Sequence, residues 1–159
     1  MKILAIHADY IEFQAKKKAF KGAEEGVEKG QSQKIEECLV IFTAVEKKDE
    51  GNVTAVMKKY ITEIKEITGN VNVEKIVLYP YAHLSSSLAN PKIAEQFMKD
   101  AQKRLSSEFK LFRAPFGWYK SFNIACKGHP LSELSREFGP EDASENAKLK
   151  REHKDEKFE

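Results

Sequence analysis

The run CLVIFTAV at residues 38–45 is the sequence feature that most constrains the fold. A segment of this length that is almost entirely apolar and carries no charge predicts a strand buried on both faces. Such a strand belongs in the centre of a sheet rather than at its edge.

Two amphipathic helices are predicted after this strand. Asn52 offers an N-cap to the first, which should close at Gly69–Asn70. Asn90 followed by Pro91 predicts a cap and a proline at the first helical position of the second. Apolar residues recur at helical spacing in both segments: Val53, Val56, Met57, Tyr60, Ile61, Ile64 and Ile67, then Ile93, Ala94, Phe97, Met98, Ala101 and Leu105.

Further strands are predicted from short apolar or alternating segments. Residues 2–7 and 11–16 are expected to form a hairpin joined at residues 7–10, and the lysine- and glycine-rich segment 16–33 a loop or partly mobile connection. The other strands are expected at 75–79, 109–112 and 120–127.

A short helix is predicted after Gly128-His129-Pro130, with Leu131, Leu134 and Phe138 on one side. The order of these elements predicts an α+β (mixed α/β) fold. It should contain a mixed sheet or barrel-like sheets and two main helices.

Length and charge indicate one domain followed by a tail. A chain of 159 residues that is 41% apolar can bury one core, expected here over residues 1–138. Residues 139–159 contain no Val, Ile or Met and are mostly charged, as expected of a linker or tail cut from something longer. The formal net charge is only +2, so any contact with a polynucleotide must be local.

The cysteines and the N-terminus indicate a cytoplasmic protein. Cys38 and Cys126 lie in apolar, strand-like segments, which suits reduced core thiols better than a disulfide or a metal site. The opening segment is too short to be a signal peptide, and no apolar stretch approaches a membrane span. No cofactor and no metal are expected.

Lys120 is the residue of greatest chemical interest. It shares strand parity with the apolar side chains of Phe122, Ile124 and Cys126. Because burying an unpaired ammonium costs several kcal/mol, a lysine on this face is either a working group or the first residue of the strand, with its head in solvent.

Other polar residues gather at the predicted strand ends, where sites in mixed sheets are commonly built. They are His7, Asp9, His83 with the serines at 85–87, Tyr119, His129 and Glu133. Four of these have a plain structural alternative. His83 could be a core histidine, the serines and His129 could cap helices, and Glu133 could be a solvated carboxylate. No glycine-rich phosphate loop, zinc spacing or serine elbow is present.

Three blocks of sequence carry a resemblance: KILAIHADYIEF at 2–13, YPYAHLSSSLANP at 79–91 and APFGWYKSFNIACKGHPLSELSR at 114–136. Together they resemble the N-terminal editing domain of archaeal-type threonyl-tRNA synthetase, over about the first 140 residues. That family shares the fold of D-aminoacyl-tRNA deacylases, a dimer of mixed sheets with helices on one side. The resemblance implies hydrolysis of serine wrongly esterified to threonine tRNA, by a water positioned with help from the 2′-hydroxyl of the terminal adenosine.

The resemblance also implies a set of site residues. Lys120, His83, Tyr119 and Glu133 match the polar residues expected to act in catalysis. The substrate is expected to contact Val45, Pro80, Tyr81, Ala82, Phe116 and Gly117, and His7, Asp9, Cys126 and His129 are expected to support the site. The implied partners are the 3′ end of tRNA(Thr) with its serine, the rest of the synthetase and a second copy of the chain, and no membrane.

Two alternatives remain open from the sequence. A free-standing D-aminoacyl-tRNA deacylase would share the fold, although the segments typical of those enzymes are missing here. A non-catalytic module that binds the tRNA acceptor end, or that only dimerises the synthetase, would place Lys120 and His83 without a shared cleft.

Overall fold

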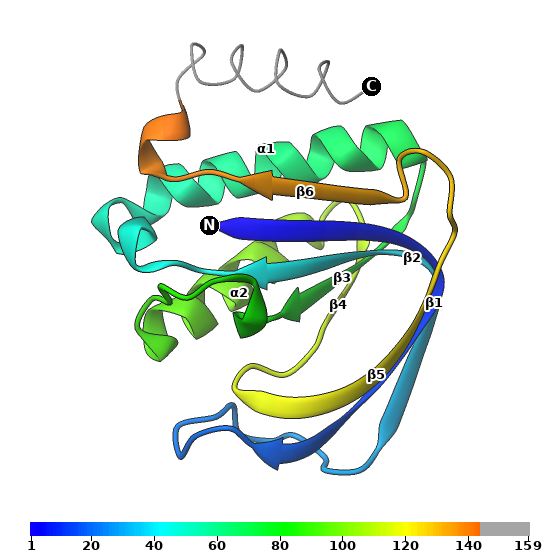
Figure 1. The fold of residues 1–159 in the computed structure, drawn as a ribbon, viewed down its shortest axis with the longest axis horizontal. Coiled ribbons are helices and arrows are strands. Elements are labelled where there is room, and N and C mark those ends of the chain that lie inside the picture. The colour runs from blue at the N-terminus through cyan, green and yellow to red at the C-terminus, as the bar shows by residue number, and fades with distance from the viewer. Residues whose placement is uncertain (144–159) are drawn as a thin grey trace.

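In the computed structural model, which describes residues 1–143, a six-stranded mixed sheet carries two α-helices (Figure 1). The strands are β1 (Lys2–Lys18), β2 (Ser32–Ala44), β3 (Lys75–Pro80), β4 (Lys110–Arg113), β5 (Trp118–Cys126) and β6 (Glu133–Glu137). The helices are α1 (Val53–Val71) and α2 (Pro91–Leu105), with short 3-10 turns η1 (Lys47–Gly51), η2 (Ala82–Leu84) and η3 (Pro140–Ala143). The predicted fold class is confirmed, and the sheet does not close into a barrel.

The strand order is β4-β3-β2-β1-β5, with β6 also paired to β1. β2, β3 and β4 are parallel, and α1 and α2 make the crossovers between them. β1 is antiparallel to all its neighbours: its first half pairs with β6 and its second half with β5. β1 is therefore the long strand from which both edge strands are positioned.

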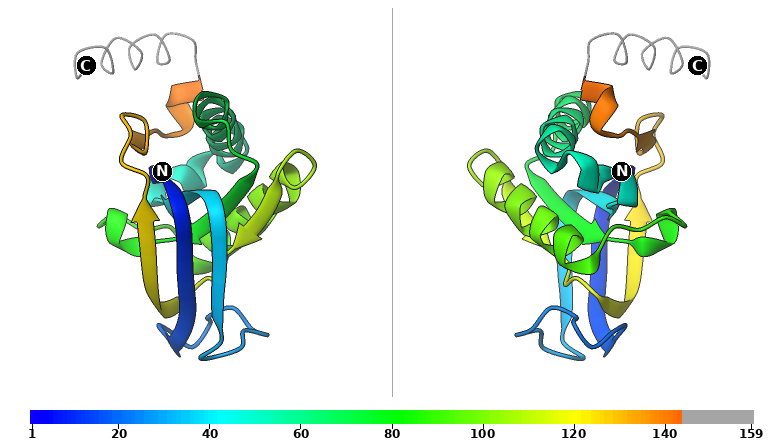
Figure 2. Two further views of the ribbon diagram at one scale, coloured as in Figure 1. Left: turned by 90° about the vertical axis from the view of Figure 1, so that its right-hand side faces the viewer. Right: turned by 90° about the vertical axis from the view of Figure 1, so that its left-hand side faces the viewer.

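The sheet has one core on each face. Both helices pack against one face of the sheet (Figure 2). Tyr60, Phe97 and Ile41 are buried in the core on this face. On the other face the curved β1 helps to enclose a second core that contains Phe13, Phe42 and Tyr79. The 38–45 segment contributes to both, as its apolar composition predicts.

The predicted helix caps are confirmed. The Asn52 side chain accepts a hydrogen bond from the backbone N–H of Ala55, and Asn90 accepts one from that of Lys92. Pro91 is the first residue of α2. The first helix extends slightly further than predicted, to Val71, and ends at Asn72 in the left-handed region with a φ of 56°.

Two predicted elements are wrong. Residues 7–10 do not turn, because β1 continues through them and pairs with β2 along almost its whole length. The predicted helix after Gly128-His129-Pro130 is a turn followed by β6, whose residues pair with the exposed edge of β1. Backbone hydrogen bonds to that edge outweigh a helical spacing of three apolar residues.

The connection between β1 and β2 is shorter and better held than predicted. Residues 16–18 and 32–33 belong to strands, and the loop between them is anchored at Glu24 by Arg113 and Trp118. Both cysteines are free; Cys38 is buried and Cys126 is only partly buried. No helix within residues 1–143 is long and apolar enough to cross a membrane. Most of the predicted tail lies outside the described residues.

Candidate functional site

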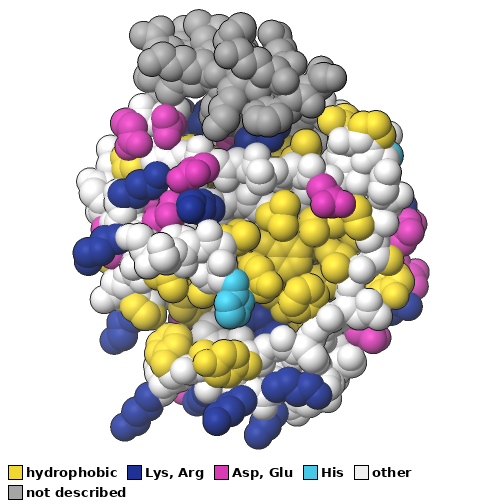
Figure 3. Space-filling view, viewed as in Figure 1, with side chains coloured by type: hydrophobic (Ala, Val, Ile, Leu, Met, Phe, Trp, Pro, Cys, Tyr) yellow, Lys and Arg dark blue, Asp and Glu magenta, His cyan; other side chains and the backbone are white. Residues whose placement is uncertain are grey.

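A cavity of about 430 Å³ opens between the end of β3, the start of β5 and the first turns of α2. Figure 3 shows hydrophobic side chains gathered beside a histidine on this side of the molecule. The size and the mostly apolar lining are typical of a pocket for a small ligand. The lining includes each predicted substrate contact: Val45, Pro80, Tyr81, Ala82, Phe116 and Gly117.

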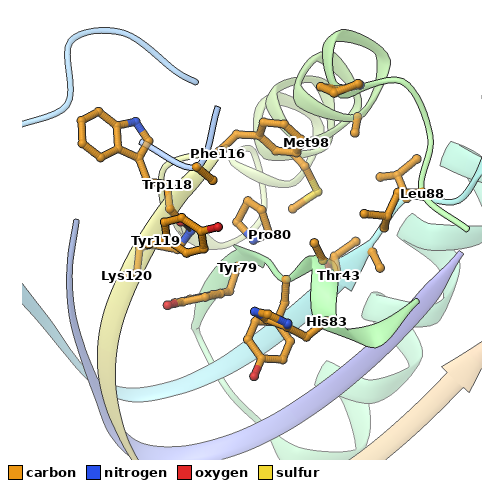
Figure 4. A pocket seen from close by; sticks show the side chains of 18 of the residues that line it. Thr43, Tyr79, Pro80, His83, Leu88, Met98, Phe116, Trp118, Tyr119 and Lys120 are labelled. Atoms are coloured by element: carbon orange, nitrogen blue, oxygen red, sulfur yellow. Dashed lines mark hydrogen bonds between the residues drawn. The ribbon is translucent and has the colours of Figure 1, made fainter. Parts of the chain in front are cut away.

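Lys120, Tyr119 and His83 all line this cavity (Figure 4). Lys120 and Tyr119 come from β5, whereas His83 comes from η2, directly after β3. These residues lie far apart in the chain, and the sheet brings them to one opening. The structural alternative for His83 is wrong, since its side chain is exposed rather than part of the core.

Lys120 is held by backbone oxygens rather than by a carboxylate. Its ammonium donates hydrogen bonds to the carbonyl oxygens of Pro115, at 2.9 Å, and Trp118, at 3.1 Å. The same nitrogen lies 5.0 Å from the centroid of the Tyr79 ring. Lys120 is the third residue of β5 and is partly buried, so the alternative of a solvated head at the strand's first residue is wrong.

Burial lowers the pKa of Lys120 to about 8, and the nearby carboxylate of Glu24 opposes part of that shift. Among the described residues that line the cavity, Lys120 is the only lysine, and there is no arginine, aspartate or glutamate. The cavity therefore offers a single cationic group in apolar surroundings, where its field is weakly screened.

Phe122 shows where the strand-parity argument fails. It shares a face with Lys120 as predicted, but it is 40% exposed and lines the cavity instead of filling the core. Its ring packs against those of Phe42, Tyr79 and Tyr81, at centroid distances of 5.7, 5.4 and 6.1 Å. β5 lies at the edge of the sheet, so parity identifies a shared face without showing that the face is covered.

The loop that carries Glu24 closes one side of the cavity. The Arg113 guanidinium forms a bidentate pair with Glu24, in which its second nitrogen lies 3.2 Å from Oε2. The Trp118 indole donates to the backbone oxygen of Glu24, at 2.9 Å, and Glu24 Oε1 accepts from the N–H of Phe116. Burial alone would raise the pKa of Glu24, but the hydrogen bonds and charge of Arg113 lower it.

Sequence reasoning missed this clamp. Glu24 lies in a segment that resembles an ordinary charged loop, and Arg113 is 89 residues away along the chain. The glycine at position 117 is a local signal in the sequence for this close approach. Its φ is +80°, and a Cβ there would lie 2.6 Å from Phe20 Cε1. Glycine is thus needed where the loop approaches the turn before Lys120.

The serines after His83 do not cap α2. Ser85 Oγ donates to Glu46 Oε2 at 2.6 Å, and Asn90 provides the cap instead. Glu46 also accepts from the N-terminal ammonium, at 2.8 Å. These bonds tie the segment beside the cavity to the first residue of the chain.

The remaining predicted site residues lie elsewhere. Glu133 pairs with Ile6 of β1 whereas Lys120 pairs with Ala15, a separation of nine residues, or about 30 Å along a strand. The Glu133 carboxylate lies 3.5 Å from Cys126 Sγ and is outside the cavity lining.

His7, Asp9 and His129 belong to the same distant region as Glu133. His7 Nδ1 lies 2.8 Å from His129 Nε2, and Asp9 forms an ion pair with Lys127 at 2.6 Å. His129 Nδ1 accepts a hydrogen bond from the backbone N–H of Leu131. His129 therefore caps a turn and not the helix that was predicted there. No group of three or more His, Cys, Asp or Glu side chains within residues 1–143 could hold a metal ion.

Over most of its length the chain is similar to threonine–tRNA ligases, a class of aminoacyl-tRNA synthetases. The chain is 52% identical to the threonine–tRNA ligase of Methanococcus vannielii over 150 residues, which are 94% of this chain and 24% of that protein. It is 50% identical to the ligase of Methanosarcina mazei over 144 residues, 91% of this chain and 23% of that protein. For the ligase of Methanothrix thermoacetophila the identity is 53% over 136 residues, with 86% and 22% covered. The chain thus spans about a quarter of these synthetases.

The matched portion is identified by a family model, which covers residues 1–138 and describes the archaea-specific editing domain of threonyl-tRNA synthetase. The chain belongs to this family, and its general role is therefore proofreading. The resemblance carried by the three sequence blocks is confirmed.

Proposed function

We propose that the chain hydrolyses the ester of serine wrongly attached to threonine tRNA, releasing serine and tRNA. The observation that carries the proposal is the Lys120 ammonium, fixed by two carbonyl oxygens inside an apolar cavity next to Tyr119 and opposite the η2 turn of His83. The cavity would take the terminal adenosine and its seryl group. The similarity to threonine–tRNA ligases provides the substrate class.

The need for such an activity follows from the chemistry of the two amino acids. Serine is threonine without one methyl group, and a binding site rejects the smaller analogue by only about 10- to 200-fold. A second site that hydrolyses the smaller ester raises the total discrimination. A narrow apolar cavity can act as that second sieve.

Lys120 is proposed to stabilise charge rather than to attack the ester. In hydrolysis a water adds to the ester carbonyl, and negative charge develops on the carbonyl oxygen before the tRNA 3′-oxygen leaves with a proton. A preorganised cation at that oxygen lowers the barrier by a few kcal/mol, on the order of a hundredfold or more in rate. Because no carboxylate among the described residues lines the cavity, the 2′-hydroxyl of the terminal ribose is proposed to help position the water.

Tyr119 and His83 are proposed to complete the polar lining. Tyr119 is 56% exposed at the mouth of the cavity, where its hydroxyl could contact the ribose. The His83 ring lies 5.2 Å from that of Tyr81, which orients it at the opposite side. Both residues would orient the substrate while Lys120 faces the reacting oxygen.

The test compares deacylation of seryl- and threonyl-tRNA(Thr) by the wild-type chain, Lys120→Met and the control Lys58→Met. Lys58 is an exposed lysine on α1, away from the cavity. Wild type and control are expected to hydrolyse the seryl ester, and Lys120→Met to lose on the order of a hundredfold in kcat. Inertness of the wild type towards both esters, with tRNA binding retained, would favour the non-catalytic alternative. Preferred hydrolysis of a D-aminoacyl ester would favour the D-aminoacyl-tRNA deacylase alternative.

A further inference from the structure

The lysine-rich end of β1 lies beside the mouth of the cavity. Lys16, Lys17 and Lys18 are all exposed at this end. In the pairing of β1 with β5, Lys17 lies opposite Tyr119 and Lys18 opposite Trp118, two residues that line the cavity. The lysine-rich end of β1 therefore lies beside Trp118 and Tyr119, two aromatic residues of the cavity lining.

A β-bulge shapes this segment. The register passes from Ala15 opposite Lys120 to Lys17 opposite Tyr119, so Lys16 is an extra residue in β1. A bulge increases the local twist and redirects side chains, and it exempts successive residues from strict alternation between two faces. The bulge interrupts the alternation at Lys16, and Lys16, Lys17 and Lys18 are all exposed at this end of β1.

Within residues 1–143, ion pairs neutralise little of this charge. Residues 16–21 contain four lysines and no acidic residue. Lys18 pairs with Glu25 at 3.1 Å, and its nitrogen lies 5.9 Å from the Trp118 ring. Among the described residues no ion pair involves Lys16, Lys17 or Lys21. Figure 3 shows basic side chains gathered along the lower edge, at the end of the molecule where Figure 1 places the β1–β2 connection.

We propose that Lys16, Lys17 and Lys21 bind the sugar-phosphate backbone of the RNA whose 3′ end enters the cavity; the choice of RNA rests on the proposed function. We call these three residues the basic rim. With a net charge of only +2 over the whole chain, contact with RNA has to be local, and the basic rim is a local group of lysines without an ion pair among the described residues. Lysines bind phosphates as point charges without reading sequence.

Exposed aromatic side chains next to the basic rim favour a single-stranded end. Phe20 is 38% exposed, and Tyr119 is more exposed still. Grooves for single strands combine backbone-tracking cations with aromatic rings on which bases stack. The basic rim would hold the phosphates while these rings guide unpaired bases towards Lys120.

The first experiment measures binding without chemistry. The affinity for uncharged tRNA(Thr) is measured by fluorescence anisotropy over a range of KCl concentrations. The variants are Lys16→Gln/Lys17→Gln/Lys21→Gln and the control Lys58→Gln/Lys65→Gln, whose lysines lie on α1. The triple variant should bind at least about tenfold more weakly at low salt, and the slope of log K against log salt should fall by about one per lysine. The control should match the wild type.

The second experiment separates RNA contacts from the reaction. With seryl-tRNA(Thr), the triple variant should show a raised KM and an unchanged kcat, whereas its kcat/KM for 3′-O-seryl-adenosine should equal that of the wild type. Equal losses on the small ester would overturn the proposal, because the lysines would then act through the cavity. Unchanged tRNA affinity in the triple variant, or an equal loss in the α1 control, would also overturn it. If the wild type hydrolyses neither ester, the proposed function fails while the binding experiment still decides the role of the basic rim.

Discussion

The ammonium of Lys120 lies over the ring of Tyr79, 5.0 Å from its centroid, and no carboxylate within residues 1–143 is hydrogen-bonded to it. The ring face and two carbonyl oxygens attract a cation without supplying a full negative charge. The positive charge is therefore available to stabilise negative charge that develops on a bound substrate. An ion pair at the same position would have largely cancelled it.

The pH dependence of hydrolysis should follow the protonation of Lys120. Burial lowers the pKa of this group to about 8, so the ammonium form dominates below pH 8 and is lost above it. We expect kcat/KM for seryl-tRNA, corrected for spontaneous ester hydrolysis, to fall with an inflection near pH 8. A rate that instead rises through pH 8 would show that the neutral amine acts, as a base.

Glu24→Gln should move that inflection to lower pH. The Glu24 carboxylate opposes the burial effect on the pKa of Lys120, so its removal makes the ammonium easier to deprotonate. The measurement is the pH profile of kcat/KM for this variant beside Glu25→Gln, whose carboxylate pairs with Lys18 at the surface. The surface variant should keep the wild-type profile. An inflection that moves to higher pH in Glu24→Gln would contradict the assigned sign.

Phe122→Ala should cost less stability than a core substitution. Strand parity alone predicts a core cavity and a loss of about 3–5 kcal/mol. Because the ring is 40% exposed, we expect a loss of about 1–2 kcal/mol in denaturant unfolding. Phe97→Ala, which truncates a ring that is 2% exposed, should cost about 3–5 kcal/mol. Equal losses of unfolding free energy in the two variants would show that the Phe122 ring is packed as a core residue.

Gly117→Ala should destabilise the wall of the cavity more than Gly128→Ala. Both glycines have a φ of +80°, so both substitutions carry a similar backbone cost, roughly 1 kcal/mol. Only at position 117 would the new Cβ meet other atoms, at 2.6 Å from Phe20 and 3.1 Å from the Ala23 backbone. A larger loss of unfolding free energy at Gly117, together with a raised KM for seryl-tRNA, is the expected outcome. Identical losses would mean that the loop does not rest on this turn.

The contact between His7 and His129 should make the protein sensitive to acid. Burial and the neighbouring His129 lower the pKa of His7 below its ordinary value of 6.5. The unfolded chain then binds a proton at a higher pH than the folded chain, so the free energy of unfolding falls as pH falls below 6.5. His7→Gln should flatten this part of the profile, measured by urea unfolding between pH 5 and 7. A slope that persists in the variant would assign the effect to other groups.

Local patterns predicted most of the elements because their causes are local. The Asn90-Pro91 pair starts α2 by capping and by a preset backbone angle, and both operate within one turn of helix. The 38–45 segment lies on a central strand because so apolar a segment must be covered on both faces. The matching blocks around His83 and Lys120 identify the family for the same reason: they are contiguous in the chain.

Features that depend on contacts between residues far apart in the chain could not be predicted from local patterns. Leu131, Leu134 and Phe138 have a helical spacing, but the open edge of β1 offers hydrogen bonds that make residues 133–137 a strand. The Glu24–Arg113 pair joins positions that no local pattern connects. Phe122 lines a cavity because β5 is an edge strand, and Lys120 has a pKa of about 8 because the fold buries it among carbonyls and rings. Local sequence patterns are enough to predict which side chains share a face and where helices begin. Long-range strand pairing determines which faces are covered, and burial then sets the chemistry of the site.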